Sequence, residues 1–111
     1  MGVMKMLHKS VLLSESINNL NIKNGGVYVD ATLGFGGHSS EILKKNKKGR
    51  LICFDQDNEA INYSKEYLSK FGDNFTIIKS NFVNMKSELN KLGITKVDGI
   101  LFDLGVSSVQ L

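Results

Sequence analysis

The chain has 111 residues, of which 41% are hydrophobic and 23% are charged, and its formal net charge is +3. This length is enough for one domain and excludes two, and such a domain buries roughly 65% of the surface of its unfolded chain without a disulfide or a metal. No apolar run is long enough to span a bilayer, so we expect a soluble protein without membrane contact.

The single cysteine, Cys53, lies in an apolar run. An intramolecular disulfide is therefore excluded, and the thiol is predicted to pack as a small hydrophobe. The first ten residues lack the long apolar stretch of a signal peptide. These features favour a reducing, cytoplasmic setting.

Apolar residues alternate along the chain between helical and strand spacing. A first helix is expected over residues 10–20, where leucine and isoleucine recur at intervals of three and four. Residues 27–29 favour a strand, and after a glycine-rich loop a helix is expected over about 38–45. Residues 51–54 are apolar throughout, as strands covered on both faces tend to be.

The second half of the chain continues the pattern. A helix is expected to begin at Asp57 or Asn58 and to end before Gly72, placed as the left-handed residue beyond the last turn. Residues 75–78 predict a third strand.

A further helix around residues 85–92 should stop at Gly93, and a fourth strand is expected over 97–104. Strands that alternate with helices of about ten residues predict a parallel sheet with helices on its faces, an α/β fold of the doubly wound kind. Such sheets usually have more than four strands, so we expect this chain to be the front part of a larger domain.

Ligands of doubly wound sheets bind at the carboxyl ends of the strands. After the first strand, Asp30 is followed by Gly34, Gly36, Gly37 and His38. Glycines let a backbone approach a ligand, and the helix start that follows offers unpaired N–H groups. A tight turn without a ligand explains the glycines equally well.

Asp55 follows the second strand, 21 residues after Gly34, where a carboxylate can accept the hydroxyls of a ribose. Its alternative role is to cap the next helix, but Asp57 is better placed for that, which leaves Asp55 for a ligand.

After the third strand, Asn81 and Phe82 could contact an adenine, although Phe82 as plain core is an equal alternative. The fourth strand ends at Asp103, an acid that leaves an apolar strand into a polar loop.

The glycine loop matches the dinucleotide pattern G-x-G-x-x-G incompletely, because Ser39 occupies the last glycine position. Asp30, four residues before Gly34, instead resembles the acid that opens the first motif of class I S-adenosylmethionine-dependent methyltransferases.

Four stretches together carry a more specific resemblance: HKSVLLSES at 8–16, YVDATLGFGGHS at 28–39, FDQDNEAI at 54–61 and VDGILFDLGVSSVQL at 97–111. They resemble the bacterial cytosine-N4 methyltransferases of small-subunit ribosomal RNA, the RsmH or MraW type. Two positions depart from that family, which usually has proline where Asn58 and Val109 stand here.

The resemblance implies a partial Rossmann-like sheet, methyl transfer from S-adenosylmethionine to the N4 amine of a cytosine, and ribosomal RNA as partner. Family members are longer, so residues 1–111 would be the N-terminal, cofactor-binding part of the domain and inactive alone. The resemblance implies these cofactor-binding residues: Gly36, Gly37, His38, Asp55, Phe82, Asp103 and Gln110.

The transfer would be a direct displacement that needs no covalent enzyme intermediate, only alignment at about 3 to 3.5 Å. A group that accepts the amine N–H would help, and Asp103 is the acid at the right strand end. Whether Asp103 contacts substrate or cofactor stays open, and no catalytic residue is assigned. We expect no metal, because His38 has no second ligand at a suitable spacing.

Two alternatives remain: an NAD-type dinucleotide-binding fragment, and a non-catalytic module whose exposed sheet edge pairs with another chain. Five basic residues between Lys44 and Arg50 are compatible with nucleic acid, but a solvated lysine-rich loop is the commoner explanation. This basic cluster is expected on the side away from the strand ends.

Overall fold

The computed structural model describes residues 20–102 of the chain. Within these residues the strands and helices alternate as predicted, and most of the helix expected over 10–20 lies outside them. The elements, in chain order, are β1 (Val27–Asp30), α2 (Gly37–Lys45), β2 (Arg50–Asp55), α3 (Asn58–Ser69), β3 (Phe75–Lys79), the 3-10 turn η1 (Phe82–Asn84), α4 (Met85–Lys91) and β4 (Gly99–Leu101).

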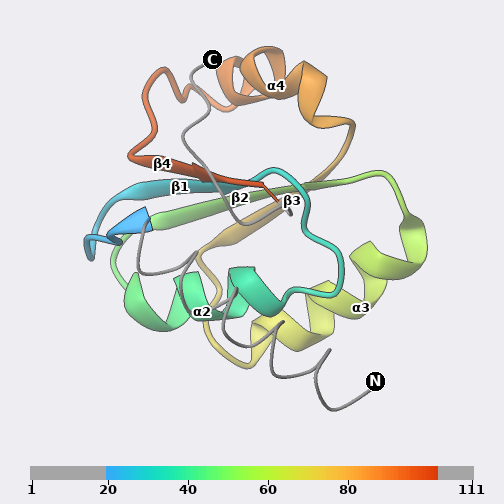
Figure 1. The fold of residues 1–111 in the computed structure, drawn as a ribbon, viewed down its shortest axis with the longest axis horizontal. Helices are drawn as coiled ribbons and strands as arrows, with labels where there is room; N and C mark the ends of the chain where they lie inside the picture. The colour runs from blue at the N-terminus through green and yellow to red at the C-terminus, as the bar shows by residue number, and fades with distance from the viewer. Residues whose placement is uncertain (1–19, 103–111) are drawn as a thin grey trace, which may run out of the picture.

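The four strands form one parallel sheet in the order β3-β2-β1-β4. Figure 1 shows α2 and α3 on one face of this sheet and α4 on the other. From β1 the chain adds β2 and β3 on one side, and it then returns to add β4 on the other side of β1. The predicted doubly wound α/β architecture is therefore confirmed. No helix within residues 20–102 is both long and apolar enough to cross a membrane.

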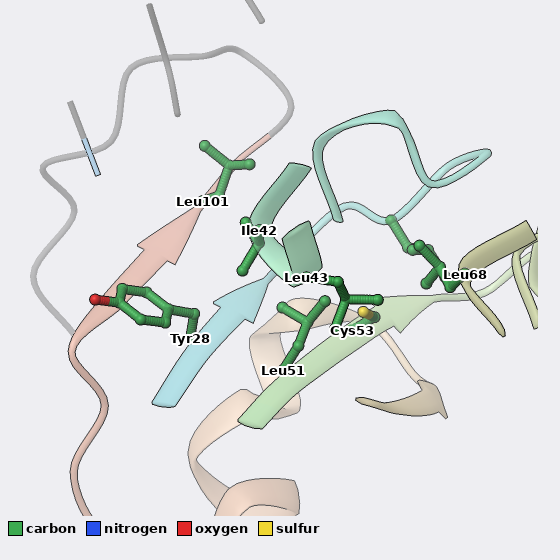
Figure 2. Packing of buried hydrophobic residues seen from close by; sticks show 8 residues of the cluster. Tyr28, Ile42, Leu43, Leu51, Cys53, Leu68 and Leu101 are labelled. Carbon is green, nitrogen blue, oxygen red and sulfur yellow. The ribbon is translucent and has the colours of Figure 1, made fainter. Parts of the chain in front are cut away.

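The two helical layers are explained by the period of two along the strands, since successive side chains point to opposite faces. On β2, Leu51 and Cys53 belong to the cluster beneath α2 and α3, whereas Ile52 and Phe54 pack toward α4. Figure 2 shows the first cluster, in which Leu51 and Cys53 lie among side chains from β1, α2, α3 and β4. Every residue from 51 to 54 is fully buried, as the apolar run predicted.

Cys53 packs as the predicted small hydrophobe, with no exposed surface. Its Sγ lies 3.4 Å from the Ser39 hydroxyl, which donates to the Asp30 carboxylate at 2.6 Å. Burial is the main cause that raises the pKa of the Cys53 thiol, and the nearby Asp30 charge adds to it, while the Ser39 hydrogen bond acts in the opposite direction.

We expect Cys53 to resist thiol reagents in the native chain, because the thiolate is the reactive form and the raised pKa keeps the thiol protonated. At pH 8, Ellman's reagent should label the urea-unfolded chain within minutes and the native chain at least about 10³-fold more slowly. The stabilisation linked to the raised pKa is present below the unfolded-state value of about 8.5 and declines as the pH rises above it. Fast native labelling would contradict the buried placement.

The structure confirms two of three predicted helix boundaries, the start of α3 and the end of α4. Asp57 caps α3, its side chain accepting from Glu59 N at 3.0 Å. Gly93 ends α4 with φ of 77°, and the hydrogen bonds from Gly93 N to Asn90 O and from Ile94 N to Leu89 O form a Schellman motif.

The predicted left-handed Gly72 beyond α3 is wrong. The helix ends at Ser69, and its last turn tightens through bonds from Lys70 N to Tyr67 O and from Phe71 N to Leu68 O. Gly72 has no positive φ; a Cβ there would approach the Asn74 side-chain oxygen to 2.8 Å. Glycine at this position therefore leaves room for the Asn74 side chain and does not form a left-handed helix cap.

The fourth strand is shorter than the predicted 97–104, covering only Gly99–Leu101, and positions 103 and 104 lie outside the described residues. Asp98 directly precedes the strand and forms two hydrogen bonds with Val27. Its amide donates to Val27 O at 2.7 Å, and its carboxylate accepts from Val27 N at 2.8 Å. The side chain takes the place of a backbone acceptor at the start of the ladder.

Asn58→Pro should stabilise the chain by about 0.4 to 1 kcal/mol. Asn58 is the first helical residue of α3, where the N–H has no intrahelical acceptor, and Asp57 before it is extended with ψ of 116°, as a residue before proline must be. Urea unfolding measures the change. Asn62→Pro, in the middle of the same helix, is the matched control and should destabilise by about 3 kcal/mol.

Candidate functional site

A pocket of about 180 Å³ opens at the carboxyl edge of the sheet, where the doubly wound fold predicts a ligand site. Its walls come from the segments that follow three adjacent strands. Ala31 and Thr32 follow β1, Gln56 follows β2, and Asn81 follows β3. The complete lining is Ala31, Thr32, Phe54, Asp55, Gln56, Ser80, Asn81 and Phe82.

The glycine loop lies beside this pocket, between β1 and α2. Gly34 and Gly36 have φ of 56° and 89°, in the left-handed region that favours glycine. Gly36 is the N-cap of α2, and a Cβ at that position would meet the Tyr67 ring at 3.3 Å. Both the loop's curvature and its close packing on α3 therefore require these glycines.

Asp55 ties the pocket to the glycine loop. One carboxylate oxygen, Oδ2, accepts from Gly34 N at 2.8 Å, and the other, Oδ1, accepts from Asp57 N at 2.9 Å. Asp55 thus has two backbone partners, and Asp57 caps α3 as predicted. Each carboxylate oxygen can accept two bonds, so both retain capacity for a ligand.

Ser64 holds the same loop from the other side and was not identified as a site residue from the sequence. This fully buried side chain of α3 donates from Oγ to Gly34 O at 2.9 Å. Gly34 is thus held by its N–H through Asp55 and by its carbonyl through Ser64. The available signal was a serine on the otherwise apolar face of the helix, because a buried hydroxyl needs a partner.

Asp30 is buried and joins the end of β1 to the first turn of α2. Its carboxylate accepts from Thr32 N at 3.1 Å and from Ser39 Oγ at 2.6 Å. Two polar atoms near this junction, Thr32 Oγ1 and His38 Nε2, are buried and have no hydrogen-bond partner among residues 20–102. Buried polar atoms rarely go unpaired, so the Thr32 hydroxyl in the pocket wall points to a polar ligand.

Phe82 stands at the rim of the pocket and is 41% exposed, which places it outside the core. Its ring meets that of Phe102 edge to face, with the centroids 5.4 Å apart. Asn81 caps the η1 turn that carries Phe82, accepting from Val83 N at 3.0 Å. The ring is therefore held at the pocket by a short structured turn.

The structure brings some of the predicted site residues together. Asp55 and Phe82 share the pocket, whereas Gly36, Gly37 and His38 form the start of α2 and connect to it through the bond between Gly34 and Asp55. Asp103 and Gln110 lie outside the described residues. Within residues 20–102, no group of three His, Cys, Asp or Glu side chains is arranged to hold a metal ion.

The basic cluster lies on the opposite edge of the sheet, as predicted. Arg50 is the first residue of β2 and pairs with Val27, the first residue of β1. This position separates the cluster from the pocket at the carboxyl edge.

Comparison with known proteins identifies the family. The model of the MraW methylase family matches residues 5–111. The chain belongs to the MraW methylase family. A curated relative from Mycoplasmopsis pulmonis, named ribosomal RNA small subunit methyltransferase H, is 60% identical over 106 residues, which are 95% of this chain and 36% of the relative. The chain thus spans about a third of the length of such relatives.

Solved structures agree with the fold. An rRNA methylase from Streptococcus thermophilus matches with a TM-score of 0.58 and 22% identity over 68% of this chain and 45% of that protein. An S-adenosylmethionine-dependent O-methyltransferase from Thermotoga maritima matches with a TM-score of 0.58 and 18% identity over 63% of this chain and 28% of that one. The described residues therefore adopt the Rossmann-like fold of S-adenosylmethionine-dependent methyltransferases.

Proposed function

We propose that this chain is the cofactor-binding, N-terminal part of a methyltransferase that uses S-adenosylmethionine to methylate the N4 amine of a cytosine in small-subunit ribosomal RNA. The observation that carries the proposal is the pocket at the carboxyl edge, where Asp55, Phe82 and the unpartnered Thr32 hydroxyl meet beside a glycine loop. The names of its relatives support ribosomal RNA as the substrate.

The residues of the pocket suit an adenosine moiety. The Asp55 carboxylate retains acceptor capacity for ribose hydroxyls, and the Phe82 ring offers an apolar face for adenine. The methionine part would lie toward Gly36, Gly37 and His38 at the start of α2, where unpaired backbone N–H groups favour a carboxylate. When bound, S-adenosylmethionine supplies an electrophilic methyl group.

The protein's contribution to such a displacement is alignment. Holding the reactants about 3 to 3.5 Å apart and in line removes much of the entropic barrier, and no covalent intermediate with a side chain is required. The chain holds the glycine loop rigidly enough for this role, through Asp55 and Ser64 on either side of Gly34. Asp103 remains our candidate for contacting either the cytosine amine or the cofactor.

We further propose that the 111-residue chain alone does not methylate RNA, because its relatives are about three times as long. The expected location is the cytoplasm. Incubation with tritiated S-adenosylmethionine and small-subunit ribosomal RNA should leave the RNA unlabelled. Robust labelling would overturn the proposed inactivity, and a methylated nucleoside other than N4-methylcytidine would overturn the proposed target atom.

Calorimetric titration with S-adenosylhomocysteine tests the cofactor assignment directly. We expect one site per chain, no heat with NAD, and unchanged binding for Asp73→Ala, an exposed acid remote from the pocket. Binding of NAD in its place would assign the chain to the dinucleotide-binding proteins. A folded chain that binds neither ligand would be a non-catalytic module.

Ser64→Ala should weaken S-adenosylhomocysteine binding by about 5- to 10-fold. The substitution leaves the Gly34 carbonyl without its donor, at a cost of about 1 kcal/mol or more that the loop recovers by moving away from its binding conformation. Ser69→Ala, which removes an exposed hydroxyl bonded within the same helix, is the matched control and should bind normally. Equal dissociation constants for the two variants would show that Ser64 does not position the loop.

A further inference from the structure

Four aromatic rings form a continuous row beside α3, which we call the aromatic strip: Phe35, Tyr63, Tyr67 and Phe71. Phe35 in the glycine loop meets Tyr63 edge to face at 5.3 Å between centroids. Tyr63 stacks on Tyr67 at 5.9 Å, and Tyr67 meets Phe71 at 5.2 Å. Tyr63 and Tyr67 are four residues apart on α3 and so share one face of the helix, and Phe71 extends the row just beyond the last helical residue, Ser69.

The two halves of the aromatic strip differ in burial. Tyr67 and Phe71 are half-buried and pack against the core cluster beneath α2 and α3. Phe35 and Tyr63 are 60% and 51% exposed and contribute little to that core. Large exposed rings at one place on a surface indicate an interaction site more than a packing role.

The far end of the aromatic strip meets the basic cluster. Lys44 Nζ lies 5.0 Å above the Phe71 ring, a cation–π contact, and Lys47 Nζ donates to Phe71 O at 2.7 Å. Lys45 and Lys48 are exposed beside them. Figure 1 shows α3 running between the two edges of the sheet, so the strip connects the glycine loop at the carboxyl edge with the lysines at the amino edge.

We propose that the aromatic strip and the lysines from 44 to 48 form a docking surface for single-stranded RNA, with bases against Phe35 and Tyr63 and phosphates near the lysines. Exposed rings at one end of a surface and cations at its other end supply the chemistry that binds single strands, because every base has a flat face and every linkage a negative charge. An apolar protein partner would gain nothing from the lysines. The inference rests on the proposed function in assuming an RNA substrate.

This surface also gives the basic cluster a role that its distance from the pocket seemed to exclude. A strand held along α3 would reach the carboxyl edge at Phe35, which is adjacent to Gly34 and Gly36 of the glycine loop. The surface would thus bind substrate outside the pocket and guide it toward the edge where the methyl group is presented.

Fluorescence anisotropy with a fluorescein-labelled, mixed-sequence RNA 12-mer tests the surface. Tyr63→Ala should raise the dissociation constant by about 5- to 100-fold, the usual loss for one stacking ring, while Tyr63→Phe, which keeps the ring, should bind like the parent. Val83→Ala removes an apolar side chain outside the strip that is even more exposed than Tyr63, and it is the control for nonspecific effects. Double-stranded RNA of the same length should bind more weakly.

Tyrosine fluorescence offers an independent readout, because the chain has no tryptophan and three tyrosines. Tyr28 is buried, so the exposed Tyr63 and its neighbour Tyr67 should account for any quenching by RNA. The joint variant Lys45→Gln with Lys48→Gln should flatten the slope of the logarithm of the binding constant against the logarithm of the salt concentration. The change should correspond to the loss of about one to two phosphate contacts.

The outcomes separate this inference from the proposed function. Parent-like RNA binding by Tyr63→Ala, or an absence of RNA binding by a chain that still binds S-adenosylhomocysteine, would overturn the docking surface alone. If the parent chain does not bind S-adenosylhomocysteine, the proposed function is overturned instead. A dimer in sedimentation that Tyr63→Ala dissociates, without RNA binding, would assign the surface to a second copy of the chain and also overturn the inference.

Discussion

Asp55→Ala should raise the dissociation constant for S-adenosylhomocysteine by about 100-fold or more. Hydrogen bonds to a charged group contribute about 1.5 to 3 kcal/mol each, and the carboxylate is proposed to accept two ribose hydroxyls, so their joint loss exceeds two factors of ten. The substitution also leaves Gly34 N and Asp57 N without their acceptor, which releases the glycine loop from β2. Calorimetric titration measures the first effect, and faster hydrogen exchange at Gly34 reports the second.

Asp55→Asn should not rescue binding. An amide can accept with only one of its two terminal atoms, so one of the two backbone N–H groups would face an NH₂ group. Asp57→Ala is the matched control two residues away: it removes the α3 cap, costs about 1 kcal/mol of stability, and should leave the dissociation constant within about twofold. If Asp55→Ala binds as tightly as Asp57→Ala, the pocket is not the cofactor site.

The contrast between Asp55 and Ser64 shows how far sequence carries a site of this kind. Asp55 could be predicted as a ligand-binding residue because it follows an apolar run and lies at a typical distance from Gly34, and both features can be read directly from the sequence. Its bond to Asp57 N is a local turn contact, but its bond to Gly34 N depends on the glycine loop curling back over β2, which no spacing encodes. Ser64 is further removed, since its partner Gly34 lies 30 residues away on another element.

The fold was predicted to a similar depth. The alternation of apolar runs with helical spacing identified every strand and α-helix within residues 20–102, although not the 3-10 turn η1, and the period of two explains the two core layers. Gly72 was misread because glycine at a helix end has two possible uses, and the sequence does not distinguish positive φ from a close approach to Asn74. The fourth strand was overextended because the Asp98 carboxylate, a tertiary contact to Val27, precedes the regular ladder.

Asn46→Ala should destabilise the chain by about 2 to 4 kcal/mol, a large share of the stability of a domain this size. Asn46 ends α2 and is 1% exposed. Its Oδ1 accepts from Gly25 N at 2.7 Å and its Nδ2 donates to Gly26 O at 2.9 Å, which ties the end of the helix to the turn before β1. Alanine would remove the acceptor of Gly25 N from a part-buried hydrogen bond and leave a void in place of the buried Asn46 amide.

The segments around Asn46 are themselves held by further side-chain bonds. The backbone carbonyl of Asn46 is itself held by Asn74 Nδ2 at 2.9 Å, which also donates to Gly49 O. A Cβ at Gly49 would fall on the Gly26 carbonyl oxygen, so the two loops are in direct contact. The amino edge of the sheet is therefore one connected polar network in which each loop fixes the next.

Urea unfolding of Asn46→Ala, with Asn62→Ala on the exposed side of α3 as control, measures the expected loss. Because the network lies at the edge opposite the pocket, the folded fraction of Asn46→Ala should bind S-adenosylhomocysteine with a dissociation constant within about twofold of the parent. A loss below about 1 kcal/mol would mean that water replaces the amide at no great cost. A much weaker dissociation constant would show instead that the two edges of the sheet are coupled, with the strands transmitting the change from the turn before β1 to the glycine loop at its other end.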